Sequence, residues 1–175
     1  MIRVFLTGYM GAGKTTLGKA LAKALGVPFI DLDWYIAERF HKNIKTLFAE
    51  RGEEGFRLVE QRMLHEVSEF ENVVISTGGG TPCFFDNMAY MNSQGQTVFL
   101  DVSPEVLFNR LRIATFNRPI LQGKSDEELR CFITEALQKR LPHYSQATYR
   151  FDGSQLESRQ QIADSVARLR QLLHL

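Results

Sequence analysis

The chain has 175 residues, of which 44% are hydrophobic and 23% are charged, and its formal net charge is +1. This length and composition are typical of one globular domain, and the near-neutral charge excludes a large nucleic-acid-binding surface. The N-terminus lacks a cleavable signal, and no apolar run approaches the ~18 residues of a membrane helix. We therefore predict a single cytoplasmic domain, residues 1–175, with no nucleic-acid or membrane partner.

Cysteine and histidine spacing favours neither a disulfide framework nor a zinc site. Cys83 and Cys131 lie far apart in the sequence, and neither belongs to a C-x-x-C motif. A reducing compartment is the simpler interpretation, and we expect both thiols to be inert small apolar groups.

Residues 8–16 fit the phosphate-binding pattern G-x-x-x-x-G-K-[ST]. Apolar residues before this stretch predict a buried strand, and helical periodicity after it predicts a helix that Gly26 ends. The loop N–H groups and the new helix N-terminus would bind an anion, Lys14 would reach the outer phosphates, and Thr15 would ligate Mg²⁺. The predicted nucleotide-binding residues are Gly11, Ala12, Gly13, Lys14, Thr15 and Thr16.

Residues 27–33 predict a second strand whose C-terminal end carries Asp31 and Asp33. Ligands of open parallel sheets bind at this end, and residues two apart on a strand point to the same side. Both carboxylates are therefore expected to face Mg²⁺ and substrate. The alternative is that they cap a helix that starts near Trp34. We favour the functional interpretation, because one aspartate would suffice for capping.

Helical periodicity extends in pieces from residue 34 to residue 70, with a polar break at 51–55. Arg57 follows the break, and at a helix start its charge would oppose the helix dipole unless it had a partner. That partner is either an anionic ligand or one of the carboxylates of Glu54 and Glu60. An ion pair at helical spacing contributes only ~0.2–0.5 kcal/mol, so we favour the ligand.

A β-branched strand over residues 73–77 ends in three glycines, Gly78, Gly79 and Gly80. Each glycine carries extra backbone entropy in the unfolded chain, so three in a row are a poor choice for a simple turn. Such a run favours a segment whose backbone touches a ligand.

The rest of the chain alternates helix and strand around one aperiodic segment. We expect a helix around 88–91 closed by Gly95, a strand at 96–102, a helix opened by Ser103 and Pro104, a capped helix that starts at Ser125 and is ended by Pro142, a strand at 147–152, and a last helix after Ser158. Periodicity disappears between 113 and 124, where Arg118 precedes a proline. A long loop in a compact domain is usually functional, and a flap could bring this arginine over a phosphate. A disordered surface loop is the alternative.

The alternation of strands and helices predicts an α/β fold with a parallel sheet and helices on both faces. Taken together, the motifs resemble the shikimate kinase family over essentially the whole chain. The resemblance is carried by Gly8–Thr16, Asp31–Asp33, the run from Ile44 through Leu47, Phe48, Gly52, Glu53, Phe56 and Arg57 to Glu60, Gly78–Gly80, Arg118–Leu121, Arg140 and Tyr144.

This resemblance implies a three-layer P-loop kinase fold whose five-stranded parallel sheet has the order 2-3-1-4-5, with a short lid at about 113–124. It also implies phosphoryl transfer from MgATP to the 3-hydroxyl of shikimate, in the pathway to chorismate and the aromatic amino acids. Mg²⁺ is then the cofactor and ATP the co-substrate. We expect a monomer, because no apolar face is left over once the sheet is covered.

The resemblance also assigns roles to individual residues. The implied catalytic residues are Lys14, Asp33 and Arg118. The implied substrate-binding residues are Asp33, Phe48, Phe56, Arg57, Gly78, Gly79, Gly80 and Arg140. Asp33 would hold the shikimate hydroxyls and accept the proton, and Arg57 and Arg140 would clamp the carboxylate. Thr15 and Asp31 would support Mg²⁺, and either Arg110 or Arg112 would meet the adenine, with Arg110 placed in the nucleotide set.

Other functions fit parts of the sequence. A gluconate kinase would share the phosphate-binding loop and the sheet, but Arg57, the triple glycine and Arg140 favour shikimate. A catalytically silent kinase-like binding protein would not need Lys14, Asp33 and Arg118, and all three are present. A GTP-hydrolysing switch is disfavoured because the sequence contains no N-K-x-D segment.

Overall fold

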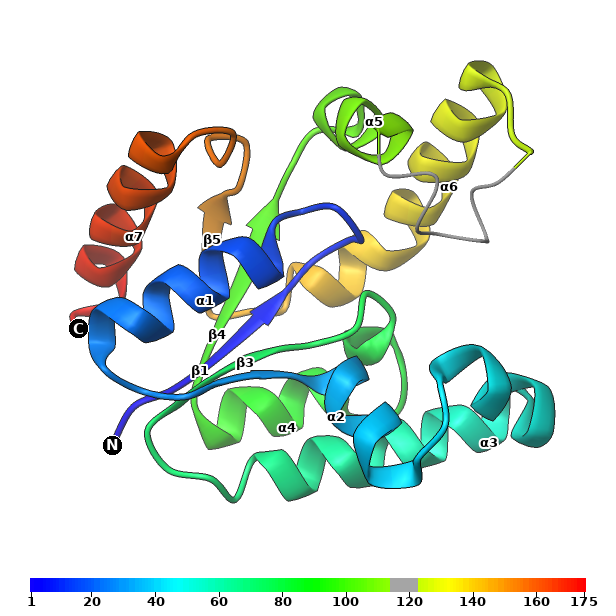
Figure 1. The fold of residues 1–175 in the computed structure, drawn as a ribbon, viewed down its shortest axis with the longest axis horizontal. Helices are drawn as coiled ribbons and strands as arrows, with labels where there is room; N and C mark the ends of the chain where they lie inside the picture. Colours follow the sequence, from blue (N-terminus) through cyan, green and yellow to red (C-terminus); the bar gives the residue numbers. More distant parts are fainter. Residues whose placement is uncertain (114–122) are drawn as a thin grey trace.

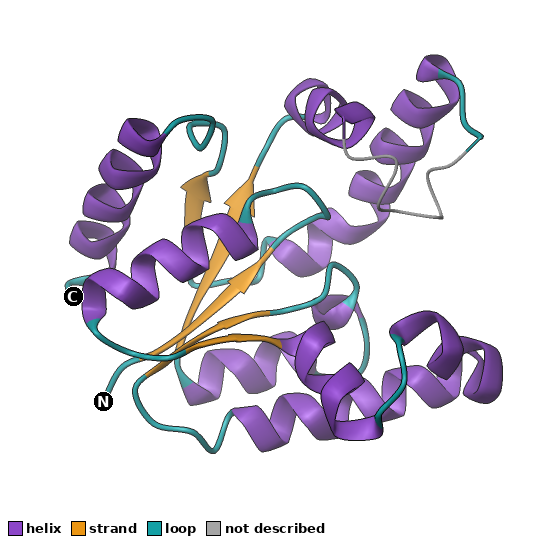
Figure 2. Cartoon of the chain, viewed as in Figure 1, coloured by secondary structure: helices purple, strands orange, loops and turns teal. Residues whose placement is uncertain are grey.

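The computed structural model describes residues 1–113 and 123–175, in which strands and helices alternate (Figure 1, Figure 2). Most of the lid predicted at about 113–124, including Arg118, lies outside the described residues. The elements are β1 (Arg3–Thr7), α1 (Lys14–Leu25), β2 (Phe29–Asp31), α2 (Leu32–Phe40), α3 (Ile44–Val67), β3 (Val73–Ser76), the 3₁₀ helix η1 (Thr81–Cys83), α4 (Asn87–Gln94), β4 (Gln96–Asp101), α5 (Pro104–Ile113), α6 (Asp126–Tyr144), β5 (Tyr149–Asp152) and α7 (Arg159–Leu173).

The described strands form one five-stranded parallel sheet with the order β2-β3-β1-β4-β5. Strand β1 lies at the centre, where Phe5 is opposite Ile75 of β3 and Thr97 of β4. Because the strands are parallel, their carboxyl ends share one edge of the sheet, and the segments that follow β1, β2 and β3 meet there. The predicted sheet order is confirmed.

Side chains of the central strands alternate between two apolar layers. Val4 and Leu6 of β1 pack with residues of α1, α5, α6 and α7, whereas Phe5 packs with residues of α2, α3 and α4. Figure 1 shows α1 and α7 on one side of the sheet and α3 and α4 on the other. This period-2 alternation explains why the strand is apolar throughout, since both of its faces are buried. The predicted three-layer arrangement is confirmed.

The second strand is shorter than predicted, and this changes the local setting of its two aspartates. β2 ends at Asp31, and α2 begins at Leu32. Asp31 is the N-cap of α2, and its Oδ1 accepts a hydrogen bond from the Trp34 N–H at 3.1 Å. The prediction that Asp31 and Asp33 share one side of a strand is therefore wrong, because Asp33 lies in the first helical turn.

Helix α3 is kinked at the predicted break, whereas α6 continues past its predicted end. Helix α3 (Ile44–Val67) consists of two helical pieces that meet in a kink at Gly52, whose φ of 70° and ψ of 176° are non-helical, so the predicted break at 51–55 is confirmed at that residue. Helix α6 continues past Pro142 to Tyr144, whose side chain is fully buried. A proline near the end of a helix removes few helical hydrogen bonds, and the burial of Tyr144 outweighs that loss.

No helix in the described parts of the chain combines the length and apolar character that a membrane span requires. The cytoplasmic location and the single-domain organisation stay predictions.

Gly95 provides a test of how closely the sheet packs against its connections. A Cβ at this position would overlap the backbone carbonyl of Arg3 in β1, which is fixed by the sheet. We expect Gly95→Ala to lower the free energy of unfolding by about 2–3 kcal/mol, measured by urea denaturation. Gly26→Ala is the comparison, because its φ of 67° strains alanine while nothing lies within 4 Å, and it should cost only about 1–2 kcal/mol. Equal losses in the two variants would contradict the close approach at Gly95.

Candidate active site

The loop between β1 and α1 has the backbone that its glycines predict. Gly11 and Gly13 adopt positive φ angles of 81° and 99°, and Gly13 is the N-cap of α1. Lys14 Nζ donates to the carbonyls of Gly8 and Tyr9 at 2.6 and 2.9 Å. The loop is therefore closed over the helix N-terminus, where backbone N–H groups and the helix dipole favour an anion.

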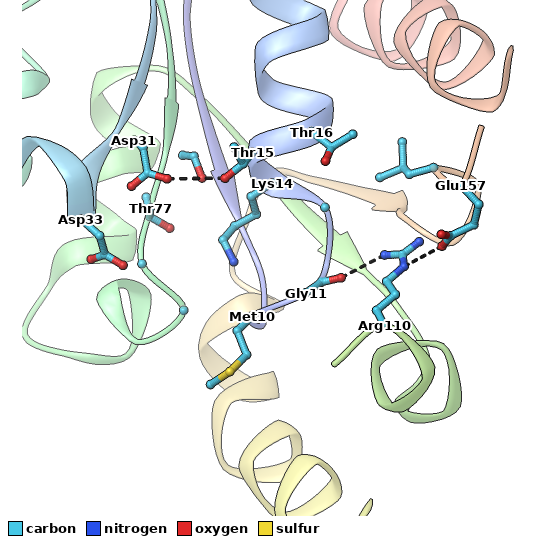
Figure 3. A pocket seen from close by; sticks show the side chains of 15 residues that line it. Met10, Gly11, Lys14, Thr15, Thr16, Asp31, Asp33, Thr77, Arg110 and Glu157 are labelled. Atoms are coloured by element: carbon cyan, nitrogen blue, oxygen red, sulfur yellow. Dashed lines mark hydrogen bonds and ion pairs between the residues drawn. The ribbon is translucent and has the colours of Figure 1, made fainter. Parts of the chain in front are cut away.

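A cavity of about 340 Å³ opens beside this loop (Figure 3). It is lined by Met10, Gly11, Gly13, Lys14, Thr15, Thr16, Asp31, Asp33, Ser76, Thr77, Gly78, Gly79, Arg110, Leu156 and Glu157. We call it the phosphate-side cavity. All the predicted nucleotide-binding residues line it except Ala12. The side chain of Ala12 is buried on the side of the loop away from the cavity, and its N–H donates to the Tyr9 carbonyl at 3.1 Å.

Thr15 and Asp31 supply oxygen ligands of the kind that Mg²⁺ prefers. The Thr15 hydroxyl donates a hydrogen bond to Asp31 Oδ2 at 3.4 Å, so the hydroxyl and the carboxylate lie next to one another in the cavity lining (Figure 3). Within the described residues, no three His, Cys, Asp or Glu side chains gather to hold a metal by themselves. The donor set thus suits a hard cation that takes its other ligands from phosphate oxygens and water. Asp31 caps α2 and also lines the cavity, so its capping role is confirmed and its role in holding Mg²⁺ stays a prediction.

Asp33 is the most strongly perturbed acid of the site. Its pKa is raised to about 6, chiefly by burial and then by the nearby Glu60 and Asp31 carboxylates, while Lys14 and Arg57 partly oppose the rise. A carboxylate with a pKa near the working pH is suited to accept a proton from a hydroxyl group. Asp33 therefore has the properties that its predicted catalytic role needs.

A second cavity, of about 200 Å³, shares Met10, Asp33, Gly78 and Gly79 with the first. We call it the acceptor-side cavity. Its other lining residues are Ile44, Phe48, Phe56, Arg57, Glu60, Gly80 and Arg140. The structure thus gathers all the substrate residues implied by the sequence around one cavity, which joins the phosphate-side cavity at Asp33.

The three glycines after β3 leave room for three functional side chains. A Cβ on Gly78 would lie 2.9 Å from Asp33 Oδ1, one on Gly79 would lie 3.0 Å from Arg140 Nη1, and one on Gly80 would lie 2.7 Å from Arg57 Nη2. None of the three has a positive φ. A side chain at any of the three positions would displace the carboxylate or guanidinium group of Asp33, Arg57 or Arg140, which gives the run a second purpose beside the predicted ligand contact.

Arg57 points into the acceptor-side cavity and also has a carboxylate partner. Its Nη1 donates to Glu60 Oε1 at 2.9 Å, and its Nη2 lies 3.9 Å from Glu53. Its guanidinium lies 4.1 Å from the ring centroid of Phe84. Glu54 is therefore the wrong candidate for the ion pair. The helical piece of α3 that contains Arg57 begins after the kink at Gly52, so Arg57 lies in its second turn, where the helix dipole acts only weakly.

Glu60 was not predicted as a site residue, and only packing reveals it. Its side chain is 1% exposed, and it accepts hydrogen bonds from Arg57 and from Thr81 Oγ1, the latter at 2.9 Å. It therefore links α3 to the residue that follows the triple glycine. The three-residue spacing from Arg57 was the available signal, and it suggested only a surface pair.

Tyr144 supports the same glycine segment from the other side. Its hydroxyl donates to the Gly79 carbonyl at 2.6 Å, and burial raises the pKa of the phenol above its usual range. Arg140, one turn earlier on α6, lies 5.4 Å from the ring centroid of Tyr9. Cys83 is half-buried and free, and burial raises the pKa of its thiol.

The structure separates the two arginines proposed for the adenine. Arg110 lines the phosphate-side cavity, and its side chain is 16% exposed. Arg112 is 61% exposed and lies 3.6 Å from Asp126, outside the residues that line either cavity. Arg110 is thus the arginine in position to meet a nucleotide.

Comparison with known proteins decides the family. The family model described as "Shikimate kinase" matches residues 10–170. The chain belongs to the shikimate kinase family. A shikimate kinase from Bacteroides thetaiotaomicron is 68% identical over 175 residues, which covers 100% of both chains.

Solved structures agree with this assignment. A crystal structure of shikimate kinase from B. thetaiotaomicron matches with a TM-score of 0.94 and 66% identity, covering 99% of each chain. A shikimate kinase from Acinetobacter baumannii, solved in complex with shikimate, matches with a TM-score of 0.84 and 30% identity, covering 99% of this chain and 94% of that one. The predicted family, P-loop kinase fold and ATP-dependent kinase activity are confirmed.

Asp33→Asn tests the cost of the buried carboxylate in protein free of metal and nucleotide. The folded pKa of about 6 lies above the ordinary 3.8, so folding favours the protonated acid. The wild-type protein is therefore free of the cost of burying a charged Asp33 below about pH 4, and it loses stability to this cost as the pH rises through 6. We expect Asp33→Asn to be more stable than wild type by up to about 3 kcal/mol at pH 7.5, with the difference shrinking toward pH 4.

Urea denaturation in EDTA at both pH values measures this difference, and the exposed Asp164→Asn gives the baseline. An Asp33→Asn variant less stable than wild type at pH 7.5 would show that burial does not dominate the environment of Asp33.

Proposed function

We propose that this protein transfers the γ-phosphoryl group of MgATP to the 3-hydroxyl of shikimate, giving shikimate 3-phosphate and ADP. One observation carries the proposal: Asp33, with Gly78 and Gly79, lines both the cavity beside the phosphate-binding loop and the cavity that contains Arg57 and Arg140. A phosphate donor and a hydroxylated anion bound in these cavities would meet at Asp33. The A. baumannii relative in complex with shikimate supports this choice of acceptor.

The phosphate-side cavity is suited to MgATP. The loop backbone and Lys14 hold the phosphates, and Thr15 and Asp31 would hold Mg²⁺, Asp31 through water. The ion supplies charge neutralisation on the phosphate oxygens when it is bound. Arg110, Leu156 and Glu157 line the same cavity at the far end of the loop from Asp33, where the nucleoside would lie (Figure 3).

The acceptor-side cavity is suited to a small hydroxylated carboxylate. Arg57 and Arg140 approach the same glycine segment from α3 and α6, and two guanidinium groups can hold a carboxylate with charge-assisted hydrogen bonds. The N–H groups of Gly79 and Gly80 add backbone donors. Phe48 and Phe56, stacked with centroids 4.2 Å apart, form an apolar wall for the ring.

The reaction then needs positioning and charge neutralisation more than covalent chemistry. Asp33 orients the 3-hydroxyl and accepts its proton as the hydroxyl oxygen attacks the γ-phosphorus. Lys14 stabilises the charge on the transferring group. Arg118 is proposed for the same task, and its role rests on the sequence because it lies outside the described residues. Both cavities are lined from one chain, so the proposed active unit is a monomer.

Turnover with MgATP and shikimate tests the proposal, with shikimate 3-phosphate identified by mass spectrometry. Gluconate in place of shikimate is the control acceptor. Phosphoryl transfer to gluconate with none to shikimate would reject the assignment.

Arg57→Lys tests the carboxylate clamp. Lysine keeps the charge that Glu60 requires but loses the planar fork that binds a carboxylate through two hydrogen bonds. We expect the KM for shikimate to rise by about tenfold or more while the KM for ATP stays near wild type, measured by steady-state kinetics. Arg39→Lys, at a 57% exposed arginine, is the matched control. An unchanged KM and kcat/KM for shikimate would remove Arg57 from the site.

Arg118→Ala tests the closing arginine. Arginines that neutralise the transferring phosphoryl group contribute about 10³–10⁵ in rate in related reactions. We expect kcat to fall by at least about 10³-fold with a much smaller change in the KM for shikimate. Arg112→Ala, at the exposed arginine on α5, should retain near wild-type kcat. A kcat for Arg118→Ala within a few-fold of wild type would exclude this role.

A further inference from the structure

Arg110 donates all of its guanidinium N–H groups to oxygen atoms of the protein. An arginine carries five such donors, and five acceptors surround this one. Nε donates to Glu157 Oε1 at 2.8 Å, Nη1 to the carbonyls of Gly11 and Ala12 at 3.0 and 3.2 Å, and Nη2 to the carbonyls of Gly153 and Ser154 at 2.7 and 3.2 Å. A phosphate oxygen would have to displace one of these partners to bind the same N–H groups.

The acceptors belong to two segments that are far apart in the sequence. One is the phosphate-binding loop, and the other is residues 153–157, which connect β5 to α7 and which we call the 153–157 segment. Figure 3 shows Arg110 reaching from α5 between Gly11 and Glu157. The segments also touch directly, since a Cβ on Gly153 would lie 2.9 Å from the Ala12 carbonyl and one on Gly13 would overlap Leu156.

Fixing these carbonyls also fixes the direction of loop N–H groups. The N–H and C=O of one trans peptide point in opposite directions, so an Arg110 bond to the Ala12 carbonyl orients the Gly13 N–H away from Arg110. Gly13 has a φ of 99° and caps α1, so its backbone holds a conformation that few other residues adopt. A donor that locks this peptide reduces the reorganisation needed when an anion binds.

We propose that Arg110 is a positioning residue that holds the phosphate-binding loop against the 153–157 segment, so that the phosphate site and the nucleoside side of the cavity are fixed together. This inference rests on the proposed nucleotide site. It differs from a role in which Arg110 contacts only the base, because it makes phosphate affinity depend on a residue with no N–H group directed at a phosphate.

Arg110→Lys is the variant that tests this role. Lysine keeps the positive charge and most of the aliphatic stem, but its three donors on one nitrogen cannot reach both segments at once. Arg112→Lys is the matched control, because Arg112 lies on the same helix, is 61% exposed and pairs with Asp126 outside the cavity. Glu157→Gln is a milder second variant, which removes the charge from one of the five acceptors.

Calorimetric titration with magnesium tripolyphosphate and, separately, with adenosine distinguishes a loop-positioning role of Arg110 from a base-contact role. If Arg110 positions the loop, the Kd for tripolyphosphate, which has no base, rises about tenfold in Arg110→Lys and stays at the wild-type value in Arg112→Lys. An unchanged tripolyphosphate Kd with weaker adenosine binding would overturn the proposal and leave Arg110 as a base contact. General destabilisation would not produce this division between the two ligands.

Hydrogen exchange on the nucleotide-free protein gives a second readout that requires no ligand. We expect faster amide exchange in peptides covering residues 9–14 and 152–158 of Arg110→Lys, a smaller increase in Glu157→Gln, and none in Arg112→Lys. Wild-type exchange rates in both segments of Arg110→Lys would overturn the proposal. If Arg110→Lys does not fold, the exchange rates of Glu157→Gln replace it in this test, and wild-type rates in that variant would overturn the proposal. Failure of wild-type shikimate turnover would reject the proposed acceptor without changing either result.

Discussion

Burial of β1 at the centre of the sheet is the constraint on which the rest of the structure depends. The strand pairs with β3 and β4 and is covered by helices on both faces, so its position and direction are fixed. The phosphate-binding loop leaves its carboxyl end, and the segments after β2 and β3 leave neighbouring strands at the same edge. Residues of the phosphate-side and acceptor-side cavities, which come from distant parts of the sequence, therefore meet at this edge.

Charge burial at that edge follows from the same geometry. Asp33 and Glu60 lie near one another in a poorly hydrated region, with Arg57 and Lys14 as the compensating cations. Each buried carboxylate would be costly alone, and Glu60 accepts hydrogen bonds from Arg57 and Thr81 that offset the cost of its burial. The carboxylate of Asp33 is compensated less completely, so its pKa is raised, and this raised pKa suits it to accept a proton. The glycines after β3 let these side chains pack against backbone, which keeps the two cavities adjacent.

The sequence predicted the elements better than their ends. Pro142 was expected to end α6, yet the helix continues to Tyr144, because the burial of Tyr144 and its hydrogen bond to the Gly79 carbonyl favour the two further residues. The break at residues 51–55 reduces to one non-helical residue, Gly52. Asp31 and Asp33 were predicted to face the same side of one strand, but β2 ends at Asp31 and Asp33 lies in the first turn of α2. Both nevertheless line the phosphate-side cavity. At Pro142, a contact with a residue far away in the sequence overrides the local preference.

The sequence by itself determined the phosphate-binding loop, the alternation of strands and helices and, through the family motifs, the residues gathered at the site. These features are contiguous or periodic, and local chemistry is sufficient to specify them. Only the tertiary structure decided that Glu60 rather than Glu54 pairs with Arg57, that burial raises the pKa of Asp33, and that Arg110 rather than Arg112 reaches the loop. Those outcomes depend on which side chains and carbonyls converge after the helices pack against the sheet, and no pattern along the chain records that convergence.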